Sequence, residues 1–192
     1  DPYFTMLWNE RTPKVRVVDA AGVTTEITVI AGSLGETAAP TPPPNSWASK
    51  PDADLVVWHI RIEAGGRWTL PQATNAETLR VLYAFEGSSV QIGTADPIAA
   101  HTGAAIVADR DLELVAGDGG IEMMLLQGRP IGEPVAQHGP FVMNTRAEIV
   151  QAFEDFRRTE FGGWPWPSPD PIHGPDAGRF AIHADGRRED PA

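Results

Sequence analysis

Short stretches of strand-forming residues follow one another along most of this chain, and turn residues separate them. Gly and Pro together supply about a fifth of the 192 residues, well above the roughly 12% that is usual. Strands joined directly by turns, without long helical stretches between them, are typical of a β-sandwich or a β-barrel. We therefore predict a mainly β fold with strands at 15–19, 24–30, 55–63, 79–85, 89–92, 104–107, 112–115 and 121–126.

The stretch 55–63 shows how such a strand would divide its side chains between two faces. Trp58 and Ile60 fall on one side of an extended chain, and His59 and Arg61 fall on the other. This alternation is typical of a strand with one buried face and one solvent-facing face. We therefore expect the apolar positions of this strand to belong to the core.

The composition excludes several classes of function. The chain has no cysteine, which removes disulfides, thiolate catalysis and cysteine-bound metal centres. Its formal net charge of −11 disfavours direct contact with nucleic-acid phosphates. No apolar run approaches the roughly 18 residues of a membrane span, and the first residues lack the features of a signal peptide. We therefore expect a cytoplasmic protein with no nucleic-acid or membrane partner, and the start at Asp1 rather than Met indicates a piece of a longer protein.

One helix stands out in the last third of the chain. Thr145 and Glu148 have the spacing of a capping box, in which each side chain bonds the backbone N–H of the other residue. Apolar residues after Thr145 recur at helical spacing, and Gly162 and Gly163 end the pattern. The stripe that this spacing predicts must pack on another surface, and it consists of Ile149, Ala152, Phe153 and Phe156.

The helix divides the chain into three parts. We assign residues 1–143 to a β-barrel with lead-in strands, residues 144–163 to a docking helix, and residues 164–192 to an extended, irregular tail. The tail has no periodicity and begins with Trp164 and Trp166, whose large side chains favour attachment to a surface.

The titratable residues form no motif that we can assign to catalysis or to metal binding. The five histidines are spread along the chain, and no two of them stand at a close ligand spacing. The sequence also lacks a Gly-x-Ser-x-Gly elbow and a phosphate-binding glycine loop. We therefore assign no catalytic residue, no metal ligand and no cofactor to this chain.

A glycine frame between Gly66 and Gly87 carries more information. The frame is similar to that of cupin barrels, in which a His-x-His pair and a glutamate between two such glycines bind a divalent metal. Gln72 and Thr74 stand here at the histidine positions, and Arg80 stands at the glutamate position. An amide and a hydroxyl are weak ligands, and a guanidinium is a permanent cation that opposes a metal. Two interpretations stay open. In the first, the frame is a metal site that has lost its ligands, and an inward Arg80 would favour an anion or a carboxylate. In the second, the glycine spacing arises by chance.

Residues 128–145, with the sequence GRPIGEPVAQHGPFVMNT, resemble the C-terminal signature of the pirin family, as do the capped helix and the Phe161-Gly162 pair after it. The resemblance implies a bicupin with two jelly-roll barrels, of which the first holds a non-haem iron and the second is usually metal-free. It implies that this chain is the second barrel, a cupin-type jelly roll, and that Fe(II) belongs to an N-terminal cupin outside this sequence. The missing ligands of the glycine frame agree with that assignment.

The family implies two kinds of function. Some members resemble quercetin 2,3-dioxygenases, in which iron activates a flavonol and oxygen, and others act as iron-dependent redox regulators of transcription partners. Both functions need the N-terminal cupin, so we expect this chain to be its non-catalytic support, or alternatively a regulatory module that binds a protein partner. The residues that we expect at the contact between the two barrels, with a plain core role as the alternative, are Phe141, Met143, Phe153, Trp164 and Trp166.

Overall fold

The computed structural model describes residues 5–163, 176, 178–183 and 185–191. Its internal contacts divide the chain into two compact units, of which the first is Asp1–Pro130 with Phe180–Ala192 and the second is Ile131–Arg179. In this division the stretch 131–143 groups with the helix, whereas the sequence-based division places it with the barrel. In the described part of the chain, no helix is long and apolar enough to cross a membrane.

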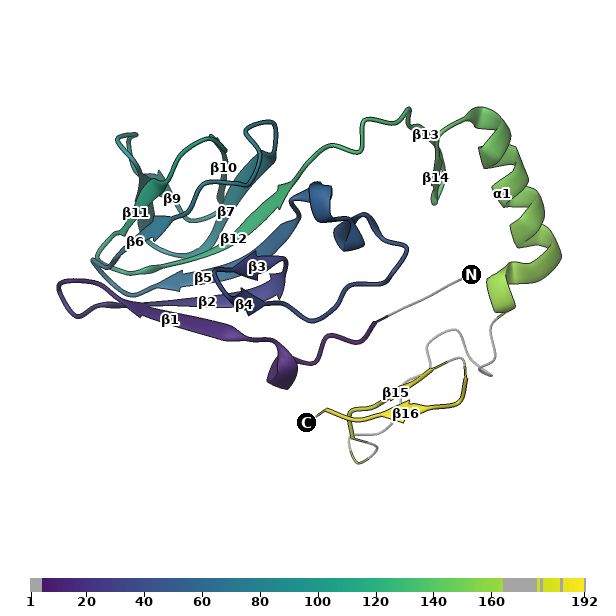
Figure 1. The fold of residues 1–192 in the computed structure, drawn as a ribbon, viewed down its shortest axis with the longest axis horizontal. Coiled ribbons are helices and arrows are strands. Elements are labelled where there is room, and N and C mark those ends of the chain that lie inside the picture. Colours follow the sequence, from purple (N-terminus) through teal and green to yellow (C-terminus); the bar gives the residue numbers. More distant parts are fainter. Residues whose placement is uncertain (1–4, 164–175, 177, 184, 192) are drawn as a thin grey trace. The chain divides into compact units, whose positions relative to one another are not determined.

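The first unit contains a six-stranded and a four-stranded sheet, in which all the pairings are antiparallel (Figure 1). The large sheet has the strand order β1 (Lys14–Val18), β2 (Thr24–Ala31), β5 (Val56–Ile62), β12 (Ile121–Gly128), β7 (Leu79–Gly87) and β10 (Thr102–Ile106). The small sheet has the order β6 (Arg67–Leu70), β11 (Leu112–Ala116), β8 (Ser89–Ile92) and β9 (Ile98–Ala99). The mainly β prediction is confirmed, and each of the eight predicted strands is present to within about two residues.

Short elements complete this unit. Strands β3 (Ser33–Leu34) and β4 (Thr37–Ala38) pair with each other after β2. Single turns of 3-10 helix lie before β1, which follows η1 (Asn9–Arg11), and before β5, which follows η2 (Trp47–Ser49) and η3 (Pro51–Ala53). The sequence patterns did not predict these pieces or β6, because they are too short to show a period.

Buried and exposed side chains alternate along the strands, and the buried ones form the core between the two sheets. In β5 the side chains of Val56, Trp58, Ile60 and Ile62 are buried, while the intervening ones are partly or wholly exposed, as predicted. Trp58 meets Trp68 of β6 edge to face, with 6.4 Å between the ring centroids. Each large apolar side chain removed from water in this way contributes about 1.5–3 kcal/mol to folding.

The two glycines of the frame stand where the backbone approaches other groups closely. A Cβ atom at Gly66 would lie 2.8 Å from a methyl group of Val23, and one at Gly87 would lie 2.4 Å from the carbonyl oxygen of Gly120. Gly87 also has a φ of +101°, which L-residues rarely adopt. The packing of the turns therefore requires both glycines, whatever side chains stand between them.

The second unit pairs a small hairpin with the predicted helix. Strands β13 (Ala136–His138) and β14 (Phe141–Met143) are followed by α1 (Arg146–Thr159) and the short turn η4 (Glu160–Gly162). The capping box predicted for Thr145 and Glu148 is present. The helix packs on the hairpin through an aromatic cluster, in which Phe141 and Phe153 lie 4.8 Å apart between ring centroids.

The C-terminal hairpin of β15 (Ala181–Ile182) and β16 (Arg188–Glu189) is tied to the segment before β1. The carboxylate of Glu189 accepts hydrogen bonds from the indole N–H of Trp8 at 2.8 Å and from Arg11 at 2.9 Å, and it lies 2.8 Å from Nε2 of His183. The hydrogen bond with His183, more than any other contact, lowers the pKa of Glu189. Residues 164–175, the Pro- and Trp-rich part of the tail, lie outside the described residues.

Candidate functional site

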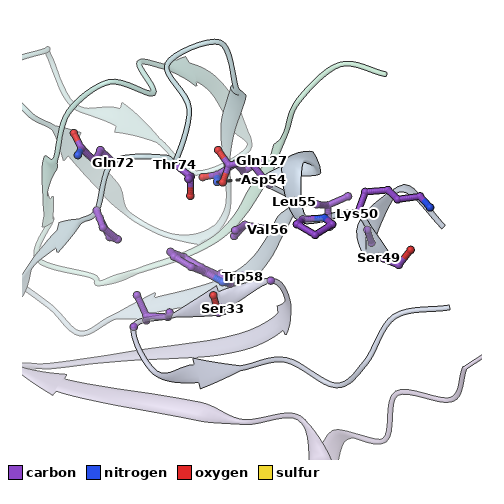
Figure 2. A pocket seen from close by; sticks show the side chains of 16 residues that line it. Ser33, Ser49, Lys50, Asp54, Leu55, Val56, Trp58, Gln72, Thr74 and Gln127 are labelled. Atoms are coloured by element: carbon purple, nitrogen blue, oxygen red, sulfur yellow. Dashed lines mark hydrogen bonds between the residues drawn. The ribbon is translucent and has the colours of Figure 1, made fainter. Parts of the chain in front are cut away.

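A polar cavity opens at one end of the first unit, where the loops before β5 and after β6 face the β3–β4 hairpin (Figure 2). Its volume is about 430 Å³, within the range of small-molecule pockets. Ser33 lines one side, and Thr74 and Gln127 line another. Leu34 also lines the cavity. The ring of Trp58 forms part of the wall from within the core.

Asp54 holds the loops around this cavity together. One carboxylate oxygen accepts a hydrogen bond from the Gln127 amide at 3.0 Å, which Figure 2 shows as a dashed line. The other oxygen accepts from the Thr78 hydroxyl at 2.6 Å and from the Asn75 backbone N–H at 3.2 Å. Asp54 itself has a φ of +47°, a left-handed conformation that Asp tolerates better than most residues. The carboxylate therefore joins the segment before β5 to the segment before β7 and to the end of β12.

Arg80 is buried inside the unit, next to two residues that line the cavity, Pro71 and Gln127. It is the cross-strand neighbour of Gln127, and only 2% of its surface is exposed. Its Nη2 donates a hydrogen bond to the carbonyl oxygen of Pro71 at 2.8 Å, while Nε and Nη1 have no partner. Burial lowers the pKa of Arg80, and attraction to Asp54 and Asp111 opposes that effect. A guanidinium stays charged under these conditions, so the interior of the unit contains a cation with unmet donors.

The structure brings the three frame residues to the same end of the unit but gives them different surroundings. Gln72 and Thr74 line the cavity and are exposed to solvent, whereas Arg80 is buried. The backbone N–H of Gln72 donates to the carboxylate of Asp111 at 2.8 Å. An amide, a hydroxyl and a fixed cation do not fit a divalent metal. Among the described residues, no three His, Cys, Asp or Glu side chains are placed to hold a metal ion.

Sequence reasoning missed Asp54, Thr78 and Gln127, although one signal pointed to two polar positions of this site. In β7 and β12, Arg80 and Gln127 occupy the same alternate positions as the buried apolar residues. A polar side chain at a buried position of a strand needs a hydrogen-bond partner. The alternation therefore indicates that Arg80 and Gln127 take part in buried polar contacts. Asp54 and Thr78 lie in loops, where no such period exists.

A second feature is an apolar cluster on the outer face of the large sheet, which we call the outer apolar face. It consists of Leu79, Tyr83 and Phe85 of β7 with Leu126 of β12, which are 64%, 46%, 39% and 42% exposed. Strands β7 and β12 are neighbours in the sheet (Figure 1), and Leu126 pairs with Val81, which stands between Leu79 and Tyr83 on the same face of β7. The solvent face of an antiparallel sheet is normally polar, and a contiguous exposed apolar patch marks an interaction site.

His59 and Glu122 border the outer apolar face. Nε2 of His59 lies 2.8 Å from a carboxylate oxygen of Glu122, and the His59 ring stacks on Phe85 with 5.7 Å between centroids. Both residues are partly exposed, and they lie outside the cavity described above. The His59–Glu122 pair therefore places polar, hydrogen-bonding groups beside Phe85 at the edge of the outer apolar face.

None of the residues predicted to contact another barrel belongs to the outer apolar face. Phe141 and Phe153 contact each other in the second unit, and Met143 is half-buried on β14 beside them. Trp164 and Trp166 lie outside the described residues. The outer apolar face was not predicted, because its residues alternate with buried ones in strands that are apolar on both sides.

Comparison with known proteins adds a family and a fold. A family model described as the pirin C-terminal cupin domain matches residues 57–162. A Pseudomonas aeruginosa protein named "Putative quercetin 2,3-dioxygenase" is 34% identical over 143 residues, covering 74% of this chain and 47% of that protein. Pirin from Homo sapiens is 40% identical over 77 residues, covering 40% of this chain and 19% of that protein.

Solved structures agree with the fold assignment. A crystal structure of quercetin 2,3-dioxygenase from Acinetobacter baumannii has a TM-score of 0.61 and 25% sequence identity, and the match covers 80% of this chain and 49% of that one. The predicted cupin fold is therefore confirmed. The chain spans about half the length of the Pseudomonas relative and of this solved structure.

Proposed function

Because the chain belongs to the pirin family, as its match to the C-terminal cupin domain shows, we propose that it is the supporting, metal-free half of a two-barrel protein. Its partner is the N-terminal cupin of the same protein. That partner binds Fe(II) and carries out the chemistry, while this chain contributes stability and part of the contact surface. In this proposal neither Arg80 nor any other residue of this chain is a metal ligand.

The outer apolar face is the observation that carries the proposal. Leu79 and Tyr83 are large apolar residues that the described part of the chain leaves 64% and 46% exposed on the outer face of the large sheet. Burying such side chains in an interface contributes about 25 cal/mol for each Å² removed from water. The chain also spans only about half the length of the Pseudomonas relative and of the solved structure, and a second segment of that size is large enough to cover this face.

The reaction that we propose for the whole protein is the dioxygenation of a flavonol such as quercetin. Two kinds of support are available: the name of the Pseudomonas relative and the solved quercetin 2,3-dioxygenase with the same fold. The bound iron would supply the oxygen chemistry. In the alternative, the whole protein is an iron-dependent regulator, and a regulatory protein partner binds to the same assembly.

The contact between the halves can be tested in the whole protein with a protease site placed before Asp1. We expect the two halves to stay together after cleavage and to separate when Tyr83→Glu and Leu126→Glu are introduced. Ile182→Glu is a matched control, because Ile182 is also an exposed apolar residue, 61% exposed, but lies on the C-terminal hairpin. Halves that separate in the wild-type protein would contradict the proposal.

The reaction is tested by oxygen uptake with quercetin. We expect the iron-loaded whole protein to consume oxygen when quercetin is added, and the isolated chain to consume none. Absence of quercetin-dependent uptake by the whole protein, with the halves still associated, would reject the enzyme and leave the regulatory alternative.

A further inference from the structure

The unmet polar groups inside the first unit are nearly all hydrogen-bond donors. In the part of the chain that the structure describes, four buried side-chain atoms have no partner: Nε and Nη1 of Arg80, Nε1 of Trp58 and Oγ1 of Thr25. The first three can only donate, and the hydroxyl of Thr25 can donate or accept. A buried donor without an acceptor costs about 1–3 kcal/mol, and more when it is charged. The interior therefore lacks acceptors.

The two nearby carboxylates do not hydrogen-bond to these donors in the structure. Asp54 already accepts from Gln127, Thr78 and Asn75, and Asp111 accepts from the backbone of Gln72. Turning the Asp54 carboxylate toward Arg80 would break bonds that hold the loops of the cavity. Their charges attract the guanidinium from a distance, but they leave its hydrogen bonds unmade.

Arg80 does not line the cavity itself but lies behind two residues that do. Pro71, whose carbonyl oxygen accepts the bond from Nη2, lines the cavity, and so does Gln127, the cross-strand neighbour of Arg80. Trp58, the second residue with an unmet donor, forms part of its wall (Figure 2). Leu34 and Val56 add apolar surface to the same wall. The cavity thus has an apolar side, and unmet donors lie behind the residues that form its wall.

We propose that this cavity binds a small organic carboxylate, which takes the place of the Pro71 carbonyl oxygen and pairs with Nη1 and Nη2 of Arg80. The two oxygens of a carboxylate match the two terminal nitrogens of a guanidinium, and such charged pairs are the strong hydrogen bonds of proteins. The organic part of the ligand lies against Leu34, Val56 and the ring of Trp58. This inference does not depend on the proposed partner barrel or its iron.

The surroundings favour a carboxylate over inorganic phosphate. Asp54 and Asp111 lie close enough to influence Arg80 electrostatically, and they would repel a second negative charge more than they repel one. Phosphate also has no apolar part to cover the wall. A volume of about 430 Å³ accommodates a ligand the size of benzoate.

The test is thermal unfolding of the chain in benzoate, acetate, succinate, phosphate and chloride at constant ionic strength, up to about 20 mM. We expect benzoate to raise the melting temperature in a saturable manner and phosphate to have a smaller effect. Arg80→Met should weaken benzoate binding at least tenfold. Arg61→Gln is the control, because the Arg61 side chain is 63% exposed on the other side of the sheet, and it should bind as the wild type does.

Two results would overturn the proposal: no carboxylate stabilises the wild-type chain, or Arg80→Met responds to benzoate as the wild type does. If Arg80→Met does not fold, the side chain can be followed by NMR in the wild-type chain. The Nε–H resonance of Arg80, assigned in the wild-type chain by through-bond correlation to its backbone, should shift on addition of benzoate but not of chloride. An unchanged resonance at saturating benzoate would reject the site.

Discussion

Replacing Asp54 tests whether its carboxylate holds the cavity loops together. Asp54→Ala removes the acceptor of the Thr78 hydroxyl, and Thr78 is only 4% exposed. It also removes one of the two acceptors of the Gln127 amide. That amide keeps its hydrogen bond to the Asp54 backbone carbonyl at 3.1 Å. Leaving buried donors unmet costs about 1–3 kcal/mol for each group. Alanine at a φ of +47° adds about 1 kcal/mol. We therefore expect a loss of about 3–5 kcal/mol in the free energy of unfolding.

The assay is urea unfolding followed by tryptophan fluorescence. With an m-value of about 2 kcal/mol per M, the expected loss lowers the midpoint by about 1.5–2.5 M without changing m. Asp54→Asn retains one acceptor oxygen and tolerates the left-handed backbone, so its loss should be about half as large. Asp52→Ala is the matched control, because the Asp52 side chain is 70% exposed, and its effect should stay within about 0.5 kcal/mol. A loss below about 1 kcal/mol for Asp54→Ala would refute the reasoning.

Three further predictions concern other parts of the chain. Gly87→Ala places a Cβ atom 2.4 Å from a backbone oxygen and should abolish soluble expression, whereas Gly22→Ala, with open space at a φ of +83°, should cost only about 1–2 kcal/mol in melting experiments. The lowered pKa of Glu189 means that its contribution to stability is complete above its ordinary pKa of 4.5 and is lost as pH falls through the lower, folded-state pKa. An acid titration of the Trp8 indole N–H by NMR should follow that loss, and Glu189→Gln should remove the titration. Phe153→Ala, at a half-buried position in the aromatic cluster, should cost about 1–3 kcal/mol in the unfolding of the helix measured by far-UV circular dichroism, and an effect under about 0.5 kcal/mol would show that the cluster is loose.

Local patterns predicted most of the fold. Strands such as 55–63 could be recognised because alternation is a property of neighbouring residues, and the helix could be recognised from Thr145 and Glu148 because a capping box acts within one turn. The glycine frame identified Arg80 as the residue of interest, and burial of its side chain agrees with an inward position.

The rest of the site depends on contacts between segments far apart in sequence. Asp54 and Gln127 are separated by 73 positions, and nothing near Asp54 in the sequence signals that its carboxylate will meet an amide from β12. The hydrogen bond between Trp8 and Glu189 spans 181 positions, and no local sequence pattern predicts it either. Long-range polar pairs of this kind arise from the topology of the sheet, which a single sequence specifies only indirectly.

The tie at Glu189 has a consequence for how the protein is made. The first unit is discontinuous: the chain leaves it after Pro130 and returns at Phe180. A nascent chain that has emerged from the ribosome only as far as the helix therefore carries all ten strands of the two main sheets. It does not yet contain Glu189, the carboxylate that bonds to Trp8 and Arg11. Glu189 can bond to Trp8 and Arg11 only after the C-terminal hairpin has been made, so a message truncated between the helix and this hairpin would produce a barrel whose segment before β1 lacks that carboxylate.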